Sequence, residues 1–194
     1  MASFGNISAS GGVYIGVAAE SIVANPGTIT GSIGVILRGN DLSKVFERIG
    51  IRFDTVKSGV YKDILSPDRP LSPEERALLQ ELIDSSYGQF VRVVAEGRSL
   101  TEETVRGFAD GRVFSGEQAK TLGLVDELGD EDHARRLAAR LADLDEQTTR
   151  PVTLGKPRKK LMNLLPGSQL IALLQQRLSL ELMGSGQVLW LYRP

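Results

Sequence analysis

The chain has 194 residues, of which 41% are hydrophobic and 24% charged, and its formal net charge is -1 at pH 7. This length suits one domain with a sizeable core, and the composition is that of a globular protein without a nucleic-acid-binding charge. Because the chain has no cysteine, a disulfide framework, a thiolate nucleophile and a cysteine-based zinc site are excluded.

The single histidine, His133, lies in a charged helical pattern far along the chain. We interpret it as a solvated helix residue, since nothing near it in sequence pairs with it. A Ser-His-Asp triad and a metal site built on several histidines are therefore not expected. No stretch approaches the roughly 18–20 apolar residues of a membrane span, and residues 1–8 lack the features of a signal peptide.

The first third of the chain alternates small-residue, β-branched and amphipathic segments. Glycine and proline separate these segments, which is typical of turns between short elements. The expected elements are a helical turn over 13–19, a strand over 21–25, a strand or tight strand-loop over 29–37, a helix over 42–49 and a strand over 51–56.

The clearest predicted helix begins after a loop over 57–72. Ser72 is its N-cap, Pro73 its first residue and Glu75 the partner in a capping box. The helix is expected to run to about Glu96 and to end at Gly97. The remaining expected elements are a helix from Thr101, a helix from Ser115 with Gln118 as its box partner, a short strand or turn over 124–128 and a helix over 130–144.

Strands that alternate with helices predict an α/β domain, which we place at residues 1–146. Residues 147–160 are polar, contain the basic cluster KPRKK and are interpreted as a linker. Residues 161–194 form a leucine-rich tail in which a helix would place its leucines on one face. This tail suits an interfacial membrane helix, or packing on the domain or a neighbouring subunit, and we favour packing.

Ser10, in the segment SASGG, precedes two glycines and an apolar segment. It either caps a helix or is a nucleophile at the head of that helix. A serine nucleophile needs a base, and without a suitable histidine that base is a carboxylate or an amine. Burial can lower the pKa of a lysine from ~10.4 to roughly 7–8. Lys57 and Lys62 are the candidates, and the apolar neighbours of Lys62 suit a partly buried base.

The two glycines after Ser10, Gly11 and Gly12, fit the nucleophile hypothesis. They permit close approach of a substrate, and a helix that starts there points N–H groups at a developing oxyanion. Asp63 adjoins Lys62, but in an extended segment adjacent side chains point to opposite faces, so we expect it to face away. Asp110 and Arg112 are expected to form a structural ion pair.

Four segments, in chain order, resemble the SppA-type signal peptide peptidases of bacteria: SASGGVYI, TGSIGVI, VKSGVYKDILSP and DGRVFSGEQAKTLGLVDELG. The likeness extends from about Ala2 to Gly129. It implies a ClpP/crotonase-like α/β fold. It also implies a serine endopeptidase that degrades signal-peptide remnants or other short apolar peptides through an acyl-enzyme, with no metal or other cofactor.

The resemblance also implies roles for individual residues. Ser10 would be the nucleophile, and Lys62, rather than Lys57, would be the general base. Ser32 of TGSIG matches a serine that hydrogen-bonds the catalytic amine. The residues that the resemblance places at the substrate are Gly11, Gly12 and Tyr14.

Members of this family carry further strands and helices before the nucleophile, with a Ser-Pro-Gly-Gly segment that the resemblance makes a second oxyanion donor. Because few residues precede Ser10, we expect an N-terminally truncated domain with a C-terminal helical tail. Loss of one oxyanion donor costs roughly 10²–10³ in rate. A second hypothesis is therefore an impaired domain that acts as an oligomerisation or regulatory module. The lysine-bearing loop argues against acyl-CoA chemistry of the crotonase kind.

The resemblance implies peptide substrates and a homo-oligomer as partners. It implies a bacterial protein that is membrane-associated or cytoplasmic. Peripheral membrane contact is the alternative to packing for the basic cluster and leucine-rich tail. The basic cluster has no interleaved aromatic residues, so nucleic acid is not an expected partner.

Overall fold

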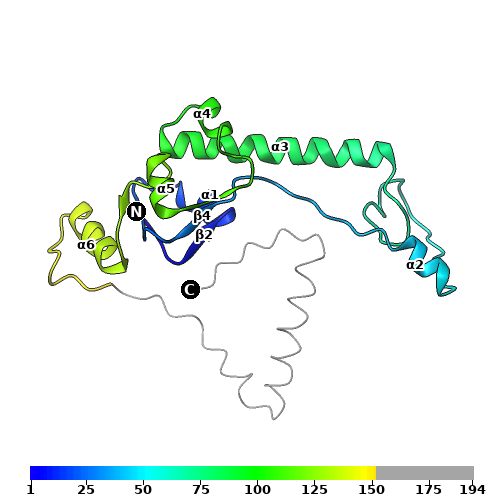
Figure 1. The fold of residues 1–194 in the computed structure, drawn as a ribbon, viewed down its shortest axis with the longest axis horizontal. Coiled ribbons are helices and arrows are strands. Elements are labelled where there is room, and N and C mark those ends of the chain that lie inside the picture. The colour runs from blue at the N-terminus through cyan, green and yellow to red at the C-terminus, as the bar shows by residue number, and fades with distance from the viewer. Residues whose placement is uncertain (152–194) are drawn as a thin grey trace, which may run out of the picture. The chain divides into compact units, whose positions relative to one another are not determined.

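The structure is a computed structural model that describes residues 1–151. Most of the predicted linker, and the whole tail at 161–194, lie outside the described residues. Within the described part, the chain divides into two compact units. The first unit consists of Met1–Val35 and the residues from Ser86 onward, and the second consists of Ile36–Ser85 (Figure 1).

The first unit contains two small sheets, each with three strands. The first sheet is entirely parallel, with β3 (Ile22–Ala24) between β1 (Ala2–Phe4) and β6 (Glu127–Leu128). In the second sheet, β4 (Ile29–Gly31) lies between a parallel strand, β2 (Ile7–Ala9), and an antiparallel strand, β5 (Val113–Ser115). Parallel strands need crossover connections, and the helices between them confirm the mixed α/β class.

Local capping signals place most helices of the first unit correctly. The hydroxyl of Thr101 accepts the N–H of Thr104 at 3.1 Å. Ser115 and Gln118 form both bonds of the predicted capping box. The helices of this unit are α1 (Gly11–Gly16), α4 (Glu102–Arg106), α5 (Gly116–Thr121), α6 (Glu131–Leu141) and the second part of α3 (Pro73–Arg98). No helix in residues 1–151 is both long enough and apolar enough to cross a bilayer.

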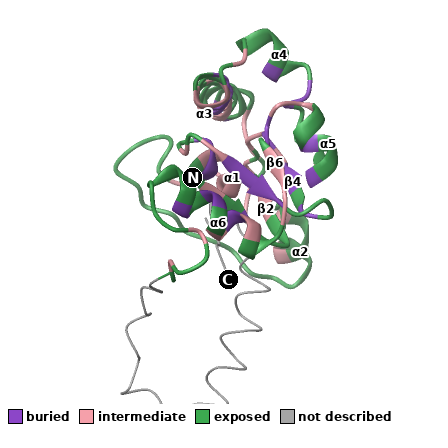
Figure 2. Ribbon diagram, turned by 90° about the vertical axis from the view of Figure 1, so that its left-hand side faces the viewer, coloured by how far each residue is buried: buried purple, intermediate pink, exposed green. Residues whose placement is uncertain are grey.

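The core of the first unit is built around β3, whose residues Ile22–Ala24 are fully buried. Val13 of α1 and Val17, directly after it, join this core, together with Val91 and Val94 of α3. Figure 2 shows the buried residues gathered on the strands and on the helices that cover them. Burial of each such aliphatic side chain contributes roughly 1.5–3 kcal/mol, so hydrophobic packing stabilises this unit.

The second unit is organised differently. It contains α2 (Ser43–Arg48), the loop that follows it and the first part of α3. Among the described residues of this unit, Glu75 is the only one that is buried. Aromatic contact is local, since the ring of Phe46 meets the ring of Phe53 edge-on at 4.8 Å. Polar contacts therefore contribute much of the stabilisation of this unit.

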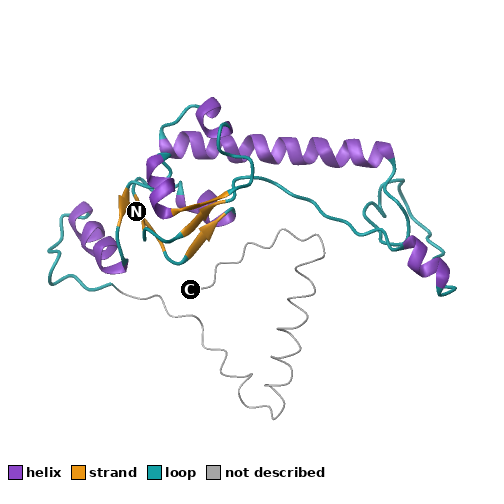
Figure 3. Ribbon diagram, viewed as in Figure 1, coloured by secondary structure: helices purple, strands orange, loops and turns teal. Residues whose placement is uncertain are grey.

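Two predicted strands differ in the structure. The strand expected over 29–37 ends at Gly31, and an irregular segment follows it (Figure 3). Gly31 and Ser32 both have positive φ angles, 79° and 51°, which take the chain away from strand geometry. The strand predicted over 51–56 is wrong: the segment is irregular and exposed. A strand needs a neighbouring strand with which its backbone groups pair. Within residues 1–151 this segment has no such neighbour, and its Phe53 packs on Phe46 of α2.

The predicted end of α3 is also wrong. The helix continues through Gly97 to Arg98 instead of ending at the glycine. A Cβ on Gly97 would lie 2.1 Å from the carbonyl oxygen of Val17, directly after α1. Gly97 therefore serves close packing between α3 and α1, rather than the end of a helix.

Gly97→Ala should destabilise the protein by about 1–3 kcal/mol, because the new methyl group must displace backbone at the contact with Val17. Gly88→Ala is the matched control in the same helix, since a Cβ there meets only Arg92 Nη1 at 3.5 Å. That control should be neutral or gain up to about 1 kcal/mol from helix propensity. Urea unfolding monitored by circular dichroism measures both, and equal stability of the two variants would contradict the packing role.

Candidate active site

Ser10 forms the whole connection between β2 and α1. Its backbone has φ 50° and ψ −110°, a conformation that costs a non-glycine residue roughly 1–3 kcal/mol. The surroundings hold it there. Its N–H donates to the carbonyl of Gly31 on β4 at 2.8 Å, and its carbonyl accepts the N–H of Tyr14 at 3.0 Å, which begins α1.

The structure shows how the side chain and backbone of Ser10 relate to the start of α1. Its side chain makes no capping hydrogen bond to α1, and its backbone is not in the extended region typical of an N-cap. Ser10 therefore stands at the N-cap position of α1, but its hydroxyl does not cap the helix. A strained serine at a sharp turn from strand to helix is the arrangement by which α/β-hydrolases present a nucleophile.

Ser32 occupies the matching position on the neighbouring strand. β2 and β4 run parallel, with Ala9 opposite Gly31, so Ser10 and Ser32 are the next residues at the same carboxyl edge. Paired strands lie about 4.8 Å apart. Ser32 also has a left-handed backbone, with φ 51°, and its N–H donates to the carbonyl of Arg112 at 2.7 Å. The structure thus brings the two predicted serines to adjacent places.

The loop at 110–112 closes over the segment that follows Ser32. Arg112 Nε donates to the two carboxylate oxygens of Asp110 at 2.8 and 2.9 Å, which confirms the predicted ion pair. This guanidinium lowers the pKa of Asp110 to about 2. The N–H of Gly111 donates to the carbonyl of Ile33 at 3.1 Å, so the pair stabilises the loop at the edge that carries Ser32.

The residues expected at the substrate lie on α1, and Gly12 and Tyr14 have close packing contacts there. A Cβ on Gly12 would come within 2.7 Å of the hydroxyl of Ser8, so a side chain there requires that hydroxyl to move. The ring of Tyr14 meets Phe90 of α3 edge-on at 5.3 Å, and its hydroxyl accepts from Gln89 at 3.1 Å. Gly11 is half-buried at the start of α1. Their roles in substrate binding stay predictions.

Lys62 belongs to the second unit, in a series of turns over residues 60–65. Its N–H donates to the carbonyl of Gly59 at 3.2 Å. Its side chain is exposed, whereas the sequence predicts a partly buried amine. The loop is not extended either, so the alternation argument for Asp63 does not apply.

Asp63 instead accepts from two cations. Lys57 Nζ lies 2.6 Å from its Oδ1, and Arg69 Nη2 lies 2.9 Å from the same oxygen. Arg69, followed by Lys57, holds the pKa of Asp63 well below its usual range. Arg69 also contacts Glu75 and lowers the pKa of that carboxyl to about 2, with help from the N–H of Ser72. Sequence reasoning overlooked Arg69; the capping-box glutamate was the only local signal near it.

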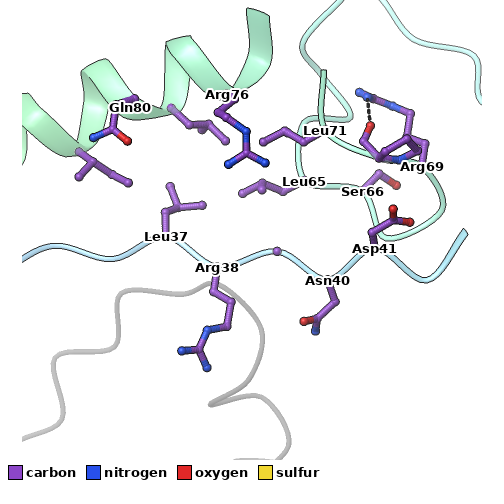
Figure 4. Close-up of a pocket in the computed structure, with 14 residues that line it drawn as sticks. Leu37, Arg38, Asn40, Asp41, Leu65, Ser66, Arg69, Leu71, Arg76 and Gln80 are labelled. Atoms are coloured by element: carbon purple, nitrogen blue, oxygen red, sulfur yellow. Dashed lines mark hydrogen bonds between the residues drawn. The ribbon is translucent and has the colours of Figure 1, made fainter. Parts of the chain in front are cut away.

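A cavity of about 490 Å³ lies within the second unit, next to this loop (Figure 4). Its walls come from three segments: the irregular chain after β4, the loop that follows Lys62, and the first part of α3. Polar and aliphatic side chains both line it; Arg76 lies among the aliphatic ones, whereas Arg38 points away from them (Figure 4). The aliphatic residues that line it are Leu37, Leu65, Leu71, Leu79 and Ile83.

His133 lies outside this group of residues but has a partner that sequence reasoning missed. It is on α6, and its Nε2 lies 2.7 Å from Oε2 of Glu127 on β6. The expectation of an unpaired, solvated histidine is therefore corrected. The pair joins a helix to a strand within the first unit. His133 is not assigned as a base for Ser10.

Comparison with known proteins places these residues in a family. The model of peptidase family S49 matches residues 1–145. A Synechocystis protein, provisionally named a protease, is 54% identical over all of this chain and 73% of its own length. A provisionally named signal peptide peptidase SppA of Enterococcus faecium is 45% identical, over 66% of this chain and 37% of its own. The chloroplastic serine protease SPPA of Arabidopsis thaliana is 36% identical, over 86% of this chain and 25% of its own.

The α/β unit with its strained serine and the matches together define the class as a serine-type peptidase, a hydrolase. Within that class, the chain belongs to peptidase family S49, and its likeness to SppA-type peptidases is confirmed. The chain spans less than half the length of two of the three relatives named.

Ser10→Gly should be more stable than Ser10→Ala by about 1 kcal/mol, because glycine adopts the backbone of Ser10 without steric cost and alanine does not. Both variants lack the hydroxyl, so the comparison isolates the backbone. Thermal unfolding of the two proteins measures the difference. A glycine variant that is less stable than the alanine variant would show that this turn is not strained.

The ion pair between Glu75 and Arg69 predicts that the stability of the protein depends on pH. The pKa of Glu75 in the folded protein, about 2, is below the ordinary value of 4.5, so its contribution is present above pH 4.5 and is lost as pH falls toward 2. Glu75→Gln should therefore be less stable than the parent protein at neutral pH. The difference in unfolding free energy between the two proteins should shrink as the pH falls from 4.5 toward 2. Urea midpoints of both proteins, measured across this pH range, provide the test. A difference that stays constant with pH would contradict the prediction.

Proposed function

We propose that this protein is a serine endopeptidase in which Ser10 is the nucleophile and Lys62 the general base, on a ClpP/crotonase-like arrangement of parallel strands and helices. The observation that carries the proposal is the left-handed backbone of Ser10 at a strand-to-helix turn, with Ser32 beside it. Membership of family S49 supports the same reading. The proposed substrates are signal-peptide remnants or other short apolar peptides.

In the proposed reaction, the neutral amine of Lys62 takes the proton of the Ser10 hydroxyl as the oxygen attacks a peptide carbonyl. The resulting ammonium then gives that proton to the departing amine, and an acyl-enzyme remains on Ser10. Water, deprotonated by the same amine, releases the acyl group and restores the serine. Ser32 is proposed to accept a hydrogen bond from Lys62 and so to orient it.

The choice of Lys62 over Lys57 has support within the second unit. Lys57 Nζ donates to Asp63 at 2.6 Å and to the carbonyl of Val60 at 3.0 Å. An ammonium engaged by a carboxylate has no lone pair to offer a hydroxyl. Since Lys62 is exposed in the structure, the water-excluded setting that a neutral lysine needs comes, in this proposal, with the bound peptide.

Two further features support peptide cleavage. Amide groups in the first turn of a helix have no acceptor within it, so the N–H of Gly11, next to the nucleophile, is the proposed donor to the oxyanion. The loop that carries Lys62 also contributes Leu65 to a cavity whose lining combines aliphatic side chains with polar and charged ones. The aliphatic part of this lining suits small or aliphatic side chains of a peptide.

Ser10→Ala should abolish peptidase activity, and Lys62→Ala should lower kcat by roughly 10²–10⁴. Lys57→Ala is the matched control, since it removes a lysine of the same loop that is engaged by Asp63. Cleavage of a fluorogenic peptide with aliphatic side chains measures all three. Loss with Lys57→Ala and retention with Lys62→Ala would overturn the assignment of the base.

A serine-directed fluorophosphonate probe separates this proposal from the alternative of an impaired regulatory or oligomerisation module. Labelling of Ser10 in the folded protein, absent in Ser10→Ala, is expected for the enzyme. Folded protein that shows no labelling would favour the module. Homo-oligomerisation and peripheral membrane contact stay predictions.

A further inference from the structure

One cluster of side chains in the second unit adjoins Lys62 but takes no part in the proposed chemistry. The guanidinium of Arg69 lies between two carboxylates. Its Nε and Nη2 donate to Oδ2 and Oδ1 of Asp63 at 3.1 and 2.9 Å. Its Nη1 and Nη2 donate to Oε2 and Oε1 of Glu75 at 2.8 and 2.5 Å. Arg69 therefore makes a forked contact with each carboxylate.

The two carboxylates belong to different local structures. Asp63 follows Lys62 directly in the turns over 60–65. Glu75 lies in the first turn of α3, where its carboxylate accepts the N–H of Ser72 at 2.9 Å and its own N–H donates to the Ser72 hydroxyl at 3.2 Å. Arg69 thus ties the turn that carries Lys62 to the capped start of a helix.

Burial and charge indicate that the side chains of this cluster are held in one arrangement. The side chain of Glu75 is 5% exposed and that of Asp63 17%, in a unit whose other described residues are mostly exposed. Both carboxyl groups have lowered pKa values, chiefly because of Arg69, so they stay ionised at neutral pH. Forked contacts between a guanidinium and a carboxylate also fix geometry better than single contacts do.

Besides this cluster, the turn of Lys62 is held by the N–H of Lys62 on the carbonyl of Gly59 and by the contact of Lys57 with Asp63. The side chain of Lys62 is exposed, and the residues just before it, 51–61, are exposed as well. A lysine is a long, flexible chain, so its amine is positioned only as well as its backbone is. Misplacement of a catalytic group by about 1 Å can cost about 100-fold in rate. A base on such a loop therefore needs an anchor nearby.

We propose that Arg69 is a positioning residue for the general base: through Asp63 it fixes the turn that carries Lys62 against the start of α3. This inference rests on the proposed function, because it takes Lys62 as the base. Arg69 touches no reacting atom and acts through the backbone of its neighbour. Its effect on the base is therefore read from kcat, since Arg69 also lines the cavity that contains Leu65.

Arg69→Lys tests the proposal in the full chain, because lysine keeps the charge but cannot make two forked contacts. We expect kcat on a fluorogenic peptide to fall at least about tenfold. KM is measured as well and compared with that of Glu75→Gln, whose side chain does not line the cavity. Arg48→Lys, the same exchange on the exposed end of α2, is the control and should change neither kcat nor KM. Melting temperatures measured alongside show that each variant is folded at the assay temperature.

Glu75→Gln is a second variant, because glutamine can keep the capping box while it weakens the contact with Arg69. It should lower kcat in the same direction and leave KM unchanged. If Arg69→Lys does not fold, this variant decides the question. A kcat within about twofold of the parent value in the folded variant would overturn the positioning role.

Ser10→Ala and Lys62→Ala, assayed beside these variants, keep the two proposals apart. If both abolish cleavage while Arg69→Lys and Glu75→Gln keep kcat and KM, only the positioning role is overturned. If Lys62→Ala keeps full activity, the proposed base is wrong and the role of Arg69 falls with it.

Discussion

One backbone hydrogen bond shapes the candidate site: the N–H of Ser10 donates to the carbonyl of Gly31 at 2.8 Å. It continues the β2–β4 pairing by one residue, so the chain must pass from strand to helix within Ser10 itself. The cost is a left-handed backbone at a residue with a side chain. Gly31 is required beside it, because a Cβ there would lie 2.5 Å from the ring of Phe114.

The two units are stabilised by different physical effects, and this difference suits their proposed roles. The first unit buries apolar side chains around β3, which makes a rigid support for Ser10 and Ser32. The second unit, among its described residues, depends on the charged cluster centred on Arg69. Ionic contacts fix a few atoms and leave the rest of a loop free to adapt, which is what a loop that meets varied peptides needs.

Whether an element was predicted correctly depends on how far apart in sequence its interacting residues lie. The helix starts at Ser72 and Ser115 were predictable, because both depend on contacts within three residues. The strand at 51–56 was predicted wrongly, because alternation describes a side-chain pattern but not a partner strand. Gly97 was misread because its neighbour, Val17, lies far away in sequence.

The sequence by itself determined the family, the capped helices and the identity of the candidate nucleophile, because motif residues and capping boxes are local. Tertiary structure decided the strained backbone of Ser10, its place beside Ser32, and the contacts of Arg69 with Asp63 and Glu75. Strand register and the closure of a loop by ion pairs depend on groups that only folding brings within reach. No local pattern in the sequence encodes them.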